Sequence, residues 1–185
     1  MASAVETMLH NDRGFTLWLT GLPGAGKSTL AKAARDDLMG QGRRVEILDG
    51  DEVRTKLGQG LGFSRNDRDT NIRRIGFVAR LLSRNGVVVI VAAISPYRDV
   101  RDEVRCDHEG AFVEVFVDCP LQELIRRDTK GLYAKALRGE IQHFTGVSDP
   151  YEPPLSPDIH IRSDAETVAE SCAKIVRWLT RHGFV

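Results

Sequence analysis

The residues with the clearest chemical potential form one short glycine-rich segment near the N-terminus. Gly21-Leu22-Pro23-Gly24-Ala25-Gly26-Lys27-Ser28 matches the pattern G-x-x-x-x-G-K-[ST], with an apolar run before it and a helix-forming stretch after it. Glycines allow successive backbone N–H groups to turn toward an anion, and the following helix N-terminus adds more donors. Lys27 can reach the β- and γ-phosphates of a nucleotide, and the Ser28 hydroxyl can bind Mg²⁺. The segment therefore predicts a phosphate-binding P-loop.

Two absences narrow the class of P-loop protein. None of the six lysines follows an Asn, so the N-K-x-D segment typical of guanine-specific proteins is missing. The run Ala92-Ala93-Ile94-Ser95 ends an apolar stretch without the Asp that a Walker-B strand would supply. These absences disfavour a switch GTPase and an ATP-driven machine.

Two carboxylates follow the second apolar run, in Asp49-Gly50-Asp51. Residues i and i+2 share a side of an extended segment, so both carboxylates can face one way. At the end of a strand next to the P-loop strand, they would point at the γ-phosphate. One could help hold Mg²⁺ through water, and the other could accept a proton from an attacking hydroxyl. The alternative is a turn in which Asp51 caps a helix that starts at Glu52, and the two roles are compatible.

A second polar cluster lies in residues 61–76. A helix that begins in this stretch places Arg68 and Asn71, three residues apart, on one face of its first turns. Arg54 adds a third polar side chain, and Phe63 adds a flat apolar surface. Together these residues suit a ligand with an anionic group and an aromatic ring, whereas the arginines taken alone would be solvated surface charges.

The pattern of the remaining sequence predicts the elements that must position these residues. Short apolar runs alternate with helix-period stretches such as Ile72, Ile75, Ala79, Leu82 and Val168, Cys172, Ile175, Leu179, which indicates an α/β fold with right-handed crossovers. We expect a three-layer fold of the P-loop NTPase type, with an about five-stranded parallel sheet and helices on both faces. The predicted strands are Phe15–Thr20, Arg44–Leu48, Val87–Ala93, Phe112–Val117 and Ile159–Ile161.

The length of 185 residues favours a single domain, residues 15–185, after an N-terminal tail of residues 1–14. One long connection, about residues 128–157, is rich in glycine and proline. A connection of that length is usually a functional lid or a disordered loop. Its aromatic residues Tyr133, Phe144 and Tyr151 favour a mobile lid that closes over a ligand rather than a solvated surface loop.

Composition excludes several classes of partner. The 26 basic and 26 acidic residues cancel, which argues against nucleic acid or an anionic membrane as the main partner. The longest apolar run, Val87–Ile94, is far shorter than the ~20 residues that span a bilayer. Residues 1–12 lack a signal-peptide pattern, and the three cysteines are widely spaced, as in a protein from a reducing compartment. We therefore expect a cytoplasmic location.

In these motifs the sequence resembles the adenylylsulfate (APS) kinase family. The resemblance runs in order from about Phe15 to Ile161. It rests on the P-loop, Asp49–Arg54, Leu61–Gly76, Ile94–Arg98, the strand Glu114–Val117, and the lid segments Arg127–Tyr133 and Phe144–Glu152. It implies an enzyme that uses ATP to phosphorylate the ribose 3′-hydroxyl of adenosine 5′-phosphosulfate, giving 3′-phosphoadenylyl sulfate and ADP in sulfate activation.

The resemblance also implies roles in the transfer. Asp51 corresponds to the residue that takes the 3′-hydroxyl proton, and Ser95 to a position where a phosphoserine intermediate has been assigned. A covalent step is not required, because phosphoryl transfer needs mainly in-line positioning and charge stabilisation. Lys27 completes the catalytic set, and Ser28 with Asp49 would hold Mg²⁺. The residues expected to bind ATP are Gly21, Leu22, Pro23, Gly24, Ala25, Gly26, Lys27, Ser28, Thr29 and Arg127, the last packing on the adenine.

The acceptor site implied by the resemblance surrounds one nucleotide. Phe63 and Phe144 would sandwich its adenine. Its other expected contacts are Asp51, Arg54, Arg68, Asn71, Ile94, Ser95, Lys130, Gly131 and Thr145. The implied partners are the small molecules ATP and APS, with no nucleic acid or membrane, and a second copy of the chain, since family members are commonly homodimers.

Two other functions remain open at this point. A P-loop kinase for a sugar, shikimate or a nucleotide would share the glycine-rich loop and paired aspartates, but would not explain the block around Phe63, Arg68 and Asn71. A non-catalytic nucleotide-sensing domain could lose Lys27 or Asp51, and this chain keeps both.

Overall fold

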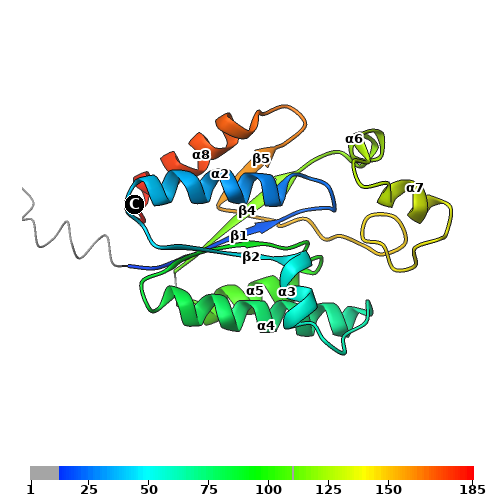
Figure 1. Cartoon of the computed structure of the whole chain (residues 1–185), viewed down its shortest axis with the longest axis horizontal. Coiled ribbons are helices and arrows are strands. Elements are labelled where there is room, and N and C mark those ends of the chain that lie inside the picture. The colour runs from blue at the N-terminus through cyan, green and yellow to red at the C-terminus, as the bar shows by residue number, and fades with distance from the viewer. Residues whose placement is uncertain (1–12, 110) are drawn as a thin grey trace, which may run out of the picture.

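The computed structural model describes residues 13–109 and 111–185, so nearly all of the expected tail, residues 1–14, lies outside the described residues. Strands and helices alternate along the described chain (Figure 1). The strands are β1 (Thr16–Thr20), β2 (Val45–Asp49), β3 (Val88–Ala92), β4 (Phe112–Asp118) and β5 (Ile159–Arg162). The helices are α2 (Lys27–Gly40), α3 (Gly50–Lys56), α4 (Arg65–Ser83), α5 (Arg98–Asp107), α6 (Leu121–Arg127), α7 (Leu132–Leu137) and α8 (Val168–Arg181). All five predicted strands and both predicted helical patterns are confirmed.

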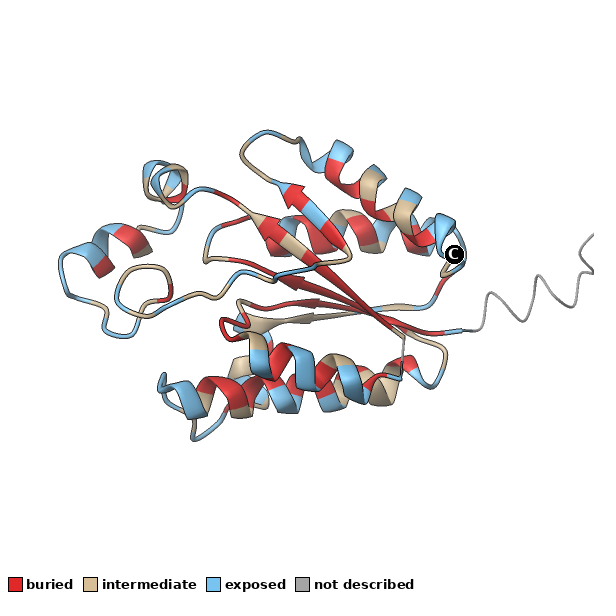
Figure 2. Ribbon diagram, turned by 180° about the vertical axis from the view of Figure 1, so that it is seen from behind, coloured by how far each residue is buried: buried red, intermediate tan, exposed pale blue. Residues whose placement is uncertain are grey.

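The five strands form one parallel sheet in the order β2-β3-β1-β4-β5. Helices α2 and α8 cover one face, and α4 and α5 cover the other, which gives the expected three layers (Figure 1). Side chains of β1 alternate between the two cores: Leu17 and Leu19 pack under α2 and α8, whereas Trp18 packs under α4 and α5. Buried residues accordingly follow the strands and the inward helix faces (Figure 2).

The sheet order corrects one expectation about the paired aspartates. We expected the strand that ends at Asp49 to lie next to the P-loop strand, but β3 lies between β1 and β2. Ala92 of β3 pairs with Leu19 on one side and Asp49 on the other. The chain passes from β1 through α2 to β2 and leaves one position in the sheet empty between them. Strand β3, which follows α4, then takes that position.

The predicted lid contains one short helix, and its last part is tied to the sheet. After α7, residues Phe144–Asp149 form a tight loop, and the chain then runs back along the sheet to β5 as a strap, residues 150–157 (Figure 1). The Glu152 N–H donates to the Pro96 carbonyl (2.8 Å), and the Glu152 carboxylate accepts from the Arg98 N–H (2.9 Å) at the start of α5. The strap is therefore docked by hydrogen bonds of its backbone and side chains.

The three aromatic residues of the lid are anchored within the protein rather than left open for a ligand. The Tyr133 hydroxyl donates to the Pro23 carbonyl (2.8 Å), and the Tyr151 hydroxyl pairs with the Thr20 hydroxyl (2.9 Å). Phe144 packs edge-on against Tyr133. The prediction that these aromatic residues close over a ligand is therefore wrong for Tyr133 and Tyr151. The Tyr133 hydroxyl is hydrogen-bonded to the P-loop, and the Tyr151 hydroxyl is hydrogen-bonded to β1.

Candidate active site

The glycine-rich loop connects β1 to α2, as its position in the sequence predicts. Gly21 approaches the end of β4 so closely that a Cβ would lie 2.3 Å from the Val117 carbonyl oxygen. Gly26 precedes the first residue of α2 with φ 96°, a conformation that favours glycine. The loop thus ends at a helix N-terminus whose first N–H groups have no intrahelical partner, which is the arrangement that binds phosphate.

Lys27 lies folded against this loop. Its Nζ donates to the carbonyl oxygens of Gly21 (2.9 Å) and Leu22 (2.8 Å), and only 8% of the residue is exposed. Burial lowers the pKa of Lys27 from its usual 10.5 to about 8, while the nearby charges of Asp51 and Asp49 oppose that change. The Lys27 ammonium therefore lies beside the phosphate-binding loop, and its two acceptors are neutral carbonyl oxygens that an anion can replace.

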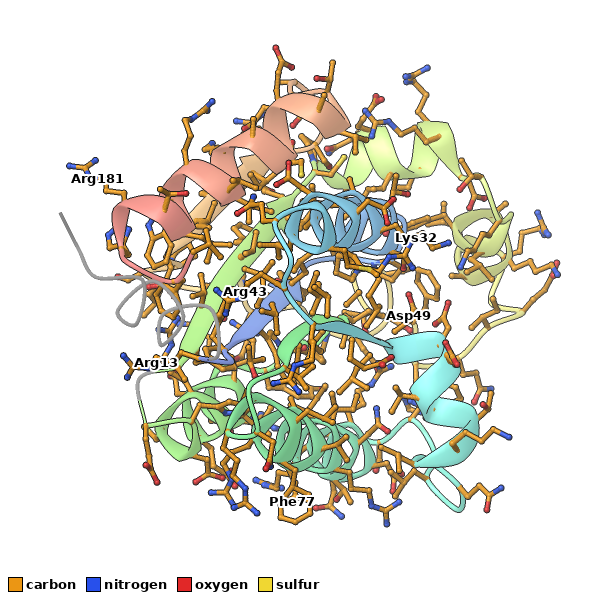
Figure 3. The ribbon with its side chains drawn as sticks, turned by 60° about the vertical axis from the view of Figure 1, so that its left-hand side comes forward. Arg13, Lys32, Arg43, Asp49, Phe77 and Arg181 are labelled. Carbon is orange, nitrogen blue, oxygen red and sulfur yellow. The ribbon has the colours of Figure 1, made fainter. Side chains whose placement is uncertain are left out.

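Ser28, in the first turn of α2, meets Asp49, at the end of β2, although β1 and β2 are not neighbours in the sheet. The Ser28 hydroxyl donates to Asp49 Oδ2 (2.6 Å), and Asp49 Oδ1 accepts from the Asp51 N–H (3.0 Å). Asp49 lies where β2 runs into α3 (labelled in Figure 3). Asp49 is therefore the N-cap of α3, and the alternative of a cap at Asp51 is wrong. Because α3 begins at Gly50, the two carboxylates do not share an extended segment.

The Ser28 and Asp49 oxygens also suit a magnesium ion. Mg²⁺ prefers hard oxygen ligands and commonly takes one or two carboxylates, completing its shell with water and substrate phosphates. Within residues 13–109 and 111–185, no group of three or more His, Cys, Asp or Glu side chains could hold a metal by itself. A hydroxyl and a carboxylate at the end of the P-loop fit a cation that arrives with a nucleotide.

Asp51 is exposed at the start of α3 and faces the lid. Its Oδ2 accepts from Lys130 Nζ (3.2 Å), which comes from the turn before α7, where Gly131 has φ 65°. The Asp51 charge acts on Lys27 and also on Arg54. Asp51 thus lies at the start of the helix that carries Arg54 and is linked through Asp49 to Ser28 of the P-loop.

The predicted acceptor residues form a stacked group at the N-terminus of α4. The Arg54 guanidinium lies 4.1 Å from the Phe63 ring centroid and donates to the Gly62 carbonyl, and the Arg68 guanidinium lies 5.7 Å from the same ring. Burial and the neighbouring Arg68 lower the pKa of Arg54. Phe63 itself is 53% exposed. Two cations and one accessible aromatic face are therefore brought together as expected.

Arg68 is bound mainly to the protein. It is 7% exposed, and it donates to Phe63 O (3.0 Å), Thr145 Oγ1 (3.0 Å), Asp149 Oδ2 (3.2 Å) and the His143 carbonyl. The expectation of a solvated surface charge is excluded, because this side chain ties α4 to the loop 143–149. Asn71, one turn along α4, is buried, and its Oδ1 has no hydrogen-bond partner among the described residues. A buried acceptor oxygen without a donor is costly unless a ligand or water satisfies it.

The structure does not support a direct catalytic role for the Ser95 side chain. Ser95 is 1% exposed, and its hydroxyl accepts from the Trp18 indole N–H (3.0 Å) inside the core under α4 and α5. A hydroxyl in that position is shielded from solvent and already has a hydrogen-bond partner. The Ile94 carbonyl next to it already accepts from the Thr20 hydroxyl (2.7 Å). Both residues shape the chain that follows β3 beside the P-loop strand, and the chemical role of Ser95 stays a prediction.

The remaining predicted residues lie around the P-loop on the lid side. Arg127, at the end of α6, is held by Glu123 (2.8 Å) and the Ser163 carbonyl (3.2 Å). Thr145 is buried against Arg68, and Phe144 is half-buried against Tyr133. Thr29 is exposed on the first turn of α2. The two aromatic residues assigned to one adenine therefore have separate partners: arginines for Phe63 and a tyrosine for Phe144.

Sequence reasoning missed the residues that hold the site together. Arg101 is fully buried and joins three segments, donating to Glu114 Oε1 (2.9 Å), Ser95 O (2.5 Å) and Glu152 O (2.8 Å). Burial raises the pKa of Glu114 against the pull of Arg101. The one available signal was the charged Glu114 in an otherwise apolar strand, since a buried carboxylate must find a partner.

Comparison with known proteins decides the family. The model of the family described as adenylylsulphate kinase matches residues 13–162. The chain belongs to this family. It is 60% identical over 173 residues to the adenylyl-sulfate kinase of Rippkaea orientalis, a match that covers 94% of this chain and 95% of that relative. The resemblance drawn from the motifs is thereby confirmed.

Solved structures of adenylylsulfate kinases have the same fold. The enzyme of Mycobacterium tuberculosis in complex with AMPPNP and APS superposes with a TM-score of 0.86 at 44% identity, covering 91% of this chain and 98% of that chain. The hexameric APS kinase from Thiobacillus denitrificans gives a TM-score of 0.73 at 37% identity; 95% of this chain is covered but only 30% of that longer chain. The expected P-loop NTPase-type fold is confirmed. Among residues 13–109 and 111–185, no helix is both long enough and apolar enough to cross a membrane.

Proposed function

We propose that this chain transfers the γ-phosphoryl group of ATP to the 3′-hydroxyl of adenosine 5′-phosphosulfate, giving 3′-phosphoadenylyl sulfate and ADP. One observation carries the proposal beyond family membership. The Asp51 carboxylate accepts from Lys130 of the lid (3.2 Å), and the Asp51 N–H donates to Asp49, which in turn accepts from Ser28 of the P-loop. A carboxylate between a phosphate loop and a cationic aromatic pocket can accept a proton from a hydroxyl that attacks the γ-phosphorus.

The residues of the P-loop supply the donor half of the reaction. The N-terminus of α2 and the loop N–H groups bind the phosphates, and Lys27 leaves the Gly21 and Leu22 carbonyls to neutralise charge that develops on the transferred group. Ser28 and Asp49 would hold Mg²⁺, which when bound screens the negative charge of the β- and γ-phosphates. Arg127, the last residue of α6, would pack on the ATP adenine.

The acceptor half is supplied by α3, the N-terminus of α4 and the loop 143–149. Phe63 offers a stacking face for adenine, and Arg54 an accessible cation for the phosphosulfate. The orphan Oδ1 of Asn71 suits a ribose hydroxyl donor. Lys130 releases Asp51 when the hydroxyl arrives, and this costs little because both side chains of the ion pair are exposed to solvent.

The proposal extends to organisation and location. We infer one catalytic domain, residues 15–185, with about residues 128–157 as a lid. The contacts of this lid with the P-loop through Tyr133 and with α4 through Arg68 must break for it to open. From the family resemblance we infer a homodimer that works in the cytoplasm on ATP and APS, with no nucleic-acid or membrane partner. Sedimentation equilibrium of the purified chain tests the dimer.

A coupled ADP-release assay with Mg-ATP tests the reaction. APS should support ADP release and yield a product phosphorylated at the ribose 3′-position, identified by mass spectrometry. AMP is the matched acceptor, because it has the same adenine and 3′-hydroxyl but lacks the sulfate. Equal rates with APS, AMP and shikimate, or no APS-dependent release, would refute the proposal.

A further inference from the structure

Tyr133 of α7 is fixed against the donor loop. The residue is 3% exposed, and its hydroxyl donates to the Pro23 carbonyl (2.8 Å) inside the P-loop. Its backbone is held as well, because the Asp128 carboxylate accepts from the N–H groups of Tyr133 (3.0 Å) and Ala134 (2.9 Å). The phenol therefore joins a capped helix of the lid to the backbone of the loop that must bind phosphate.

The opposite side of Tyr133 faces the acceptor loop. Its ring meets the Phe144 ring edge-to-face, with centroids 5.1 Å apart and an interplanar angle of 79°, a favourable geometry for an aromatic pair. A second contact runs parallel to this one: a Cβ at Gly146 would lie 2.7 Å from a methyl carbon of Leu22. The P-loop and the loop Phe144–Asp149 are thus packed against each other, with Tyr133 bridging them.

Resting on the proposed function, we propose that Tyr133 is a positioning residue that couples the ATP site to the acceptor site. Its hydroxyl holds Pro23, and its ring sets the orientation of Phe144, the proposed stacking partner of the acceptor adenine. Nucleotide that orders the P-loop therefore also orders Phe144. Because such coupling is reciprocal, a change at Phe144 must change the affinity of the P-loop for nucleotide by way of Tyr133.

Tyr151 provides a matched comparison within the same chain. It is a second lid tyrosine with a mostly buried ring, and its hydroxyl also makes one hydrogen bond, to the Thr20 side chain (2.9 Å). Its ring stacks on Phe116 of β4 (6.1 Å) instead of Phe144. Removal of either hydroxyl therefore costs one partly buried hydrogen bond, but only Tyr133 lies between the P-loop and Phe144.

A double-mutant cycle of Y133F and F144L, read by the affinity for Mg-AMPPNP in calorimetry without acceptor, tests the coupling. We expect Y133F to weaken AMPPNP binding about two- to ten-fold, the range for one buried hydrogen bond. F144L should weaken it about two-fold or more in the parent protein and clearly less in the Y133F background. In the control cycle, Y151F and F144L should act independently. Additive effects in the first cycle, or equal coupling in the control cycle, would overturn the proposal.

Two further measurements make every outcome decisive. If Y133F does not fold by circular dichroism, Asp128→Ala loosens α7 without touching the aromatic ring and should reduce the same coupling. The effect of APS on AMPPNP affinity should also fall in Y133F and not in Y151F. Because the cycle needs no acceptor, coupling in a chain that fails to phosphorylate APS would refute the proposed function alone. Additivity in a chain that does phosphorylate APS would refute the role of Tyr133 alone.

Discussion

Replacing Lys27 by Met should change how the stability of the nucleotide-free protein depends on pH. Burial lowers the pKa of Lys27 to about 8, against 10.5 for the free side chain. Between these two values the unfolded chain binds a proton that the folded chain has lost. The free energy of unfolding contributed by this group therefore rises with pH. K27M removes the group, so the parent protein should gain stability relative to K27M as pH increases.

The size of the effect follows from the two pKa values. Their difference corresponds to roughly 3 kcal/mol at the acid limit, where both states are charged and folding carries the full burial penalty. About 1 kcal/mol of that penalty disappears between pH 7 and pH 9. The difference in unfolding free energy between the parent protein and K27M also includes the hydrogen bonds of Lys27 to Gly21 and Leu22. The test therefore compares how this difference changes with pH, and not its absolute value.

Urea denaturation at pH 7, 8 and 9 measures this change, with no nucleotide present. Lys32, exposed on the same helix (labelled in Figure 3), provides the control, since K32M should leave the pH dependence of the parent protein in place. Ionisation of buried tyrosines and cysteines affects all three proteins equally and cancels in the comparison. A difference between parent and K27M that stays constant from pH 7 to pH 9, or moves in the opposite direction, would show that the ammonium is not buried as described.

Three further substitutions test other parts of the site. Asp51→Asn should lower kcat by about 10²–10⁴ with little change in AMPPNP affinity, and near-normal steady-state turnover would reject Asp51 as the general base. Ser95→Ala should keep most of the turnover but lose about 1–3 kcal/mol of stability in urea, because the Trp18 N–H loses its acceptor; loss of turnover in a folded variant would restore a chemical role for the hydroxyl. Asp149→Ala should cost about 3–5 kcal/mol, because it leaves the buried Arg68 guanidinium without its carboxylate, and a variant with parental thermal stability would show that this ion pair contributes nothing.

The fold was largely predictable because its signals are local. A strand covered on both faces reads as an unbroken apolar run, as in β3, and α4 and α8 bury one stripe at helical spacing. The order of strands in the sheet is not local. Nothing in the run that ends at Asp49 indicates that a later strand will enter between it and β1, so its neighbour could not be read from the sequence.

The candidate site was predictable where a motif determines the backbone conformation. It was not predictable where a side chain is hydrogen-bonded to a residue far away in the sequence. The Gly21–Ser28 loop carries its geometry in its glycines. The hydroxyl of Ser95, by contrast, is bound by an indole 77 residues away, and Arg68 by a carboxylate 81 residues away. Their residue types suit a ligand and suit these partners equally well. The aromatics of the lid show the same ambiguity, which only the packing against β1 and the P-loop resolved.

The cap that Glu152 provides to α5 has a consequence for the order in which the chain folds. The helix has no side-chain cap of its own at Tyr97, and its first N–H is satisfied across 54 residues by the strap. Contacts of such separation close late, because the intervening chain must first lose its freedom. During synthesis α5 is made before Glu152, so its first turn should stay frayed until the strap docks on it. Amide hydrogen exchange should accordingly show Arg98 gaining protection together with the strap and not with the helix to which it belongs.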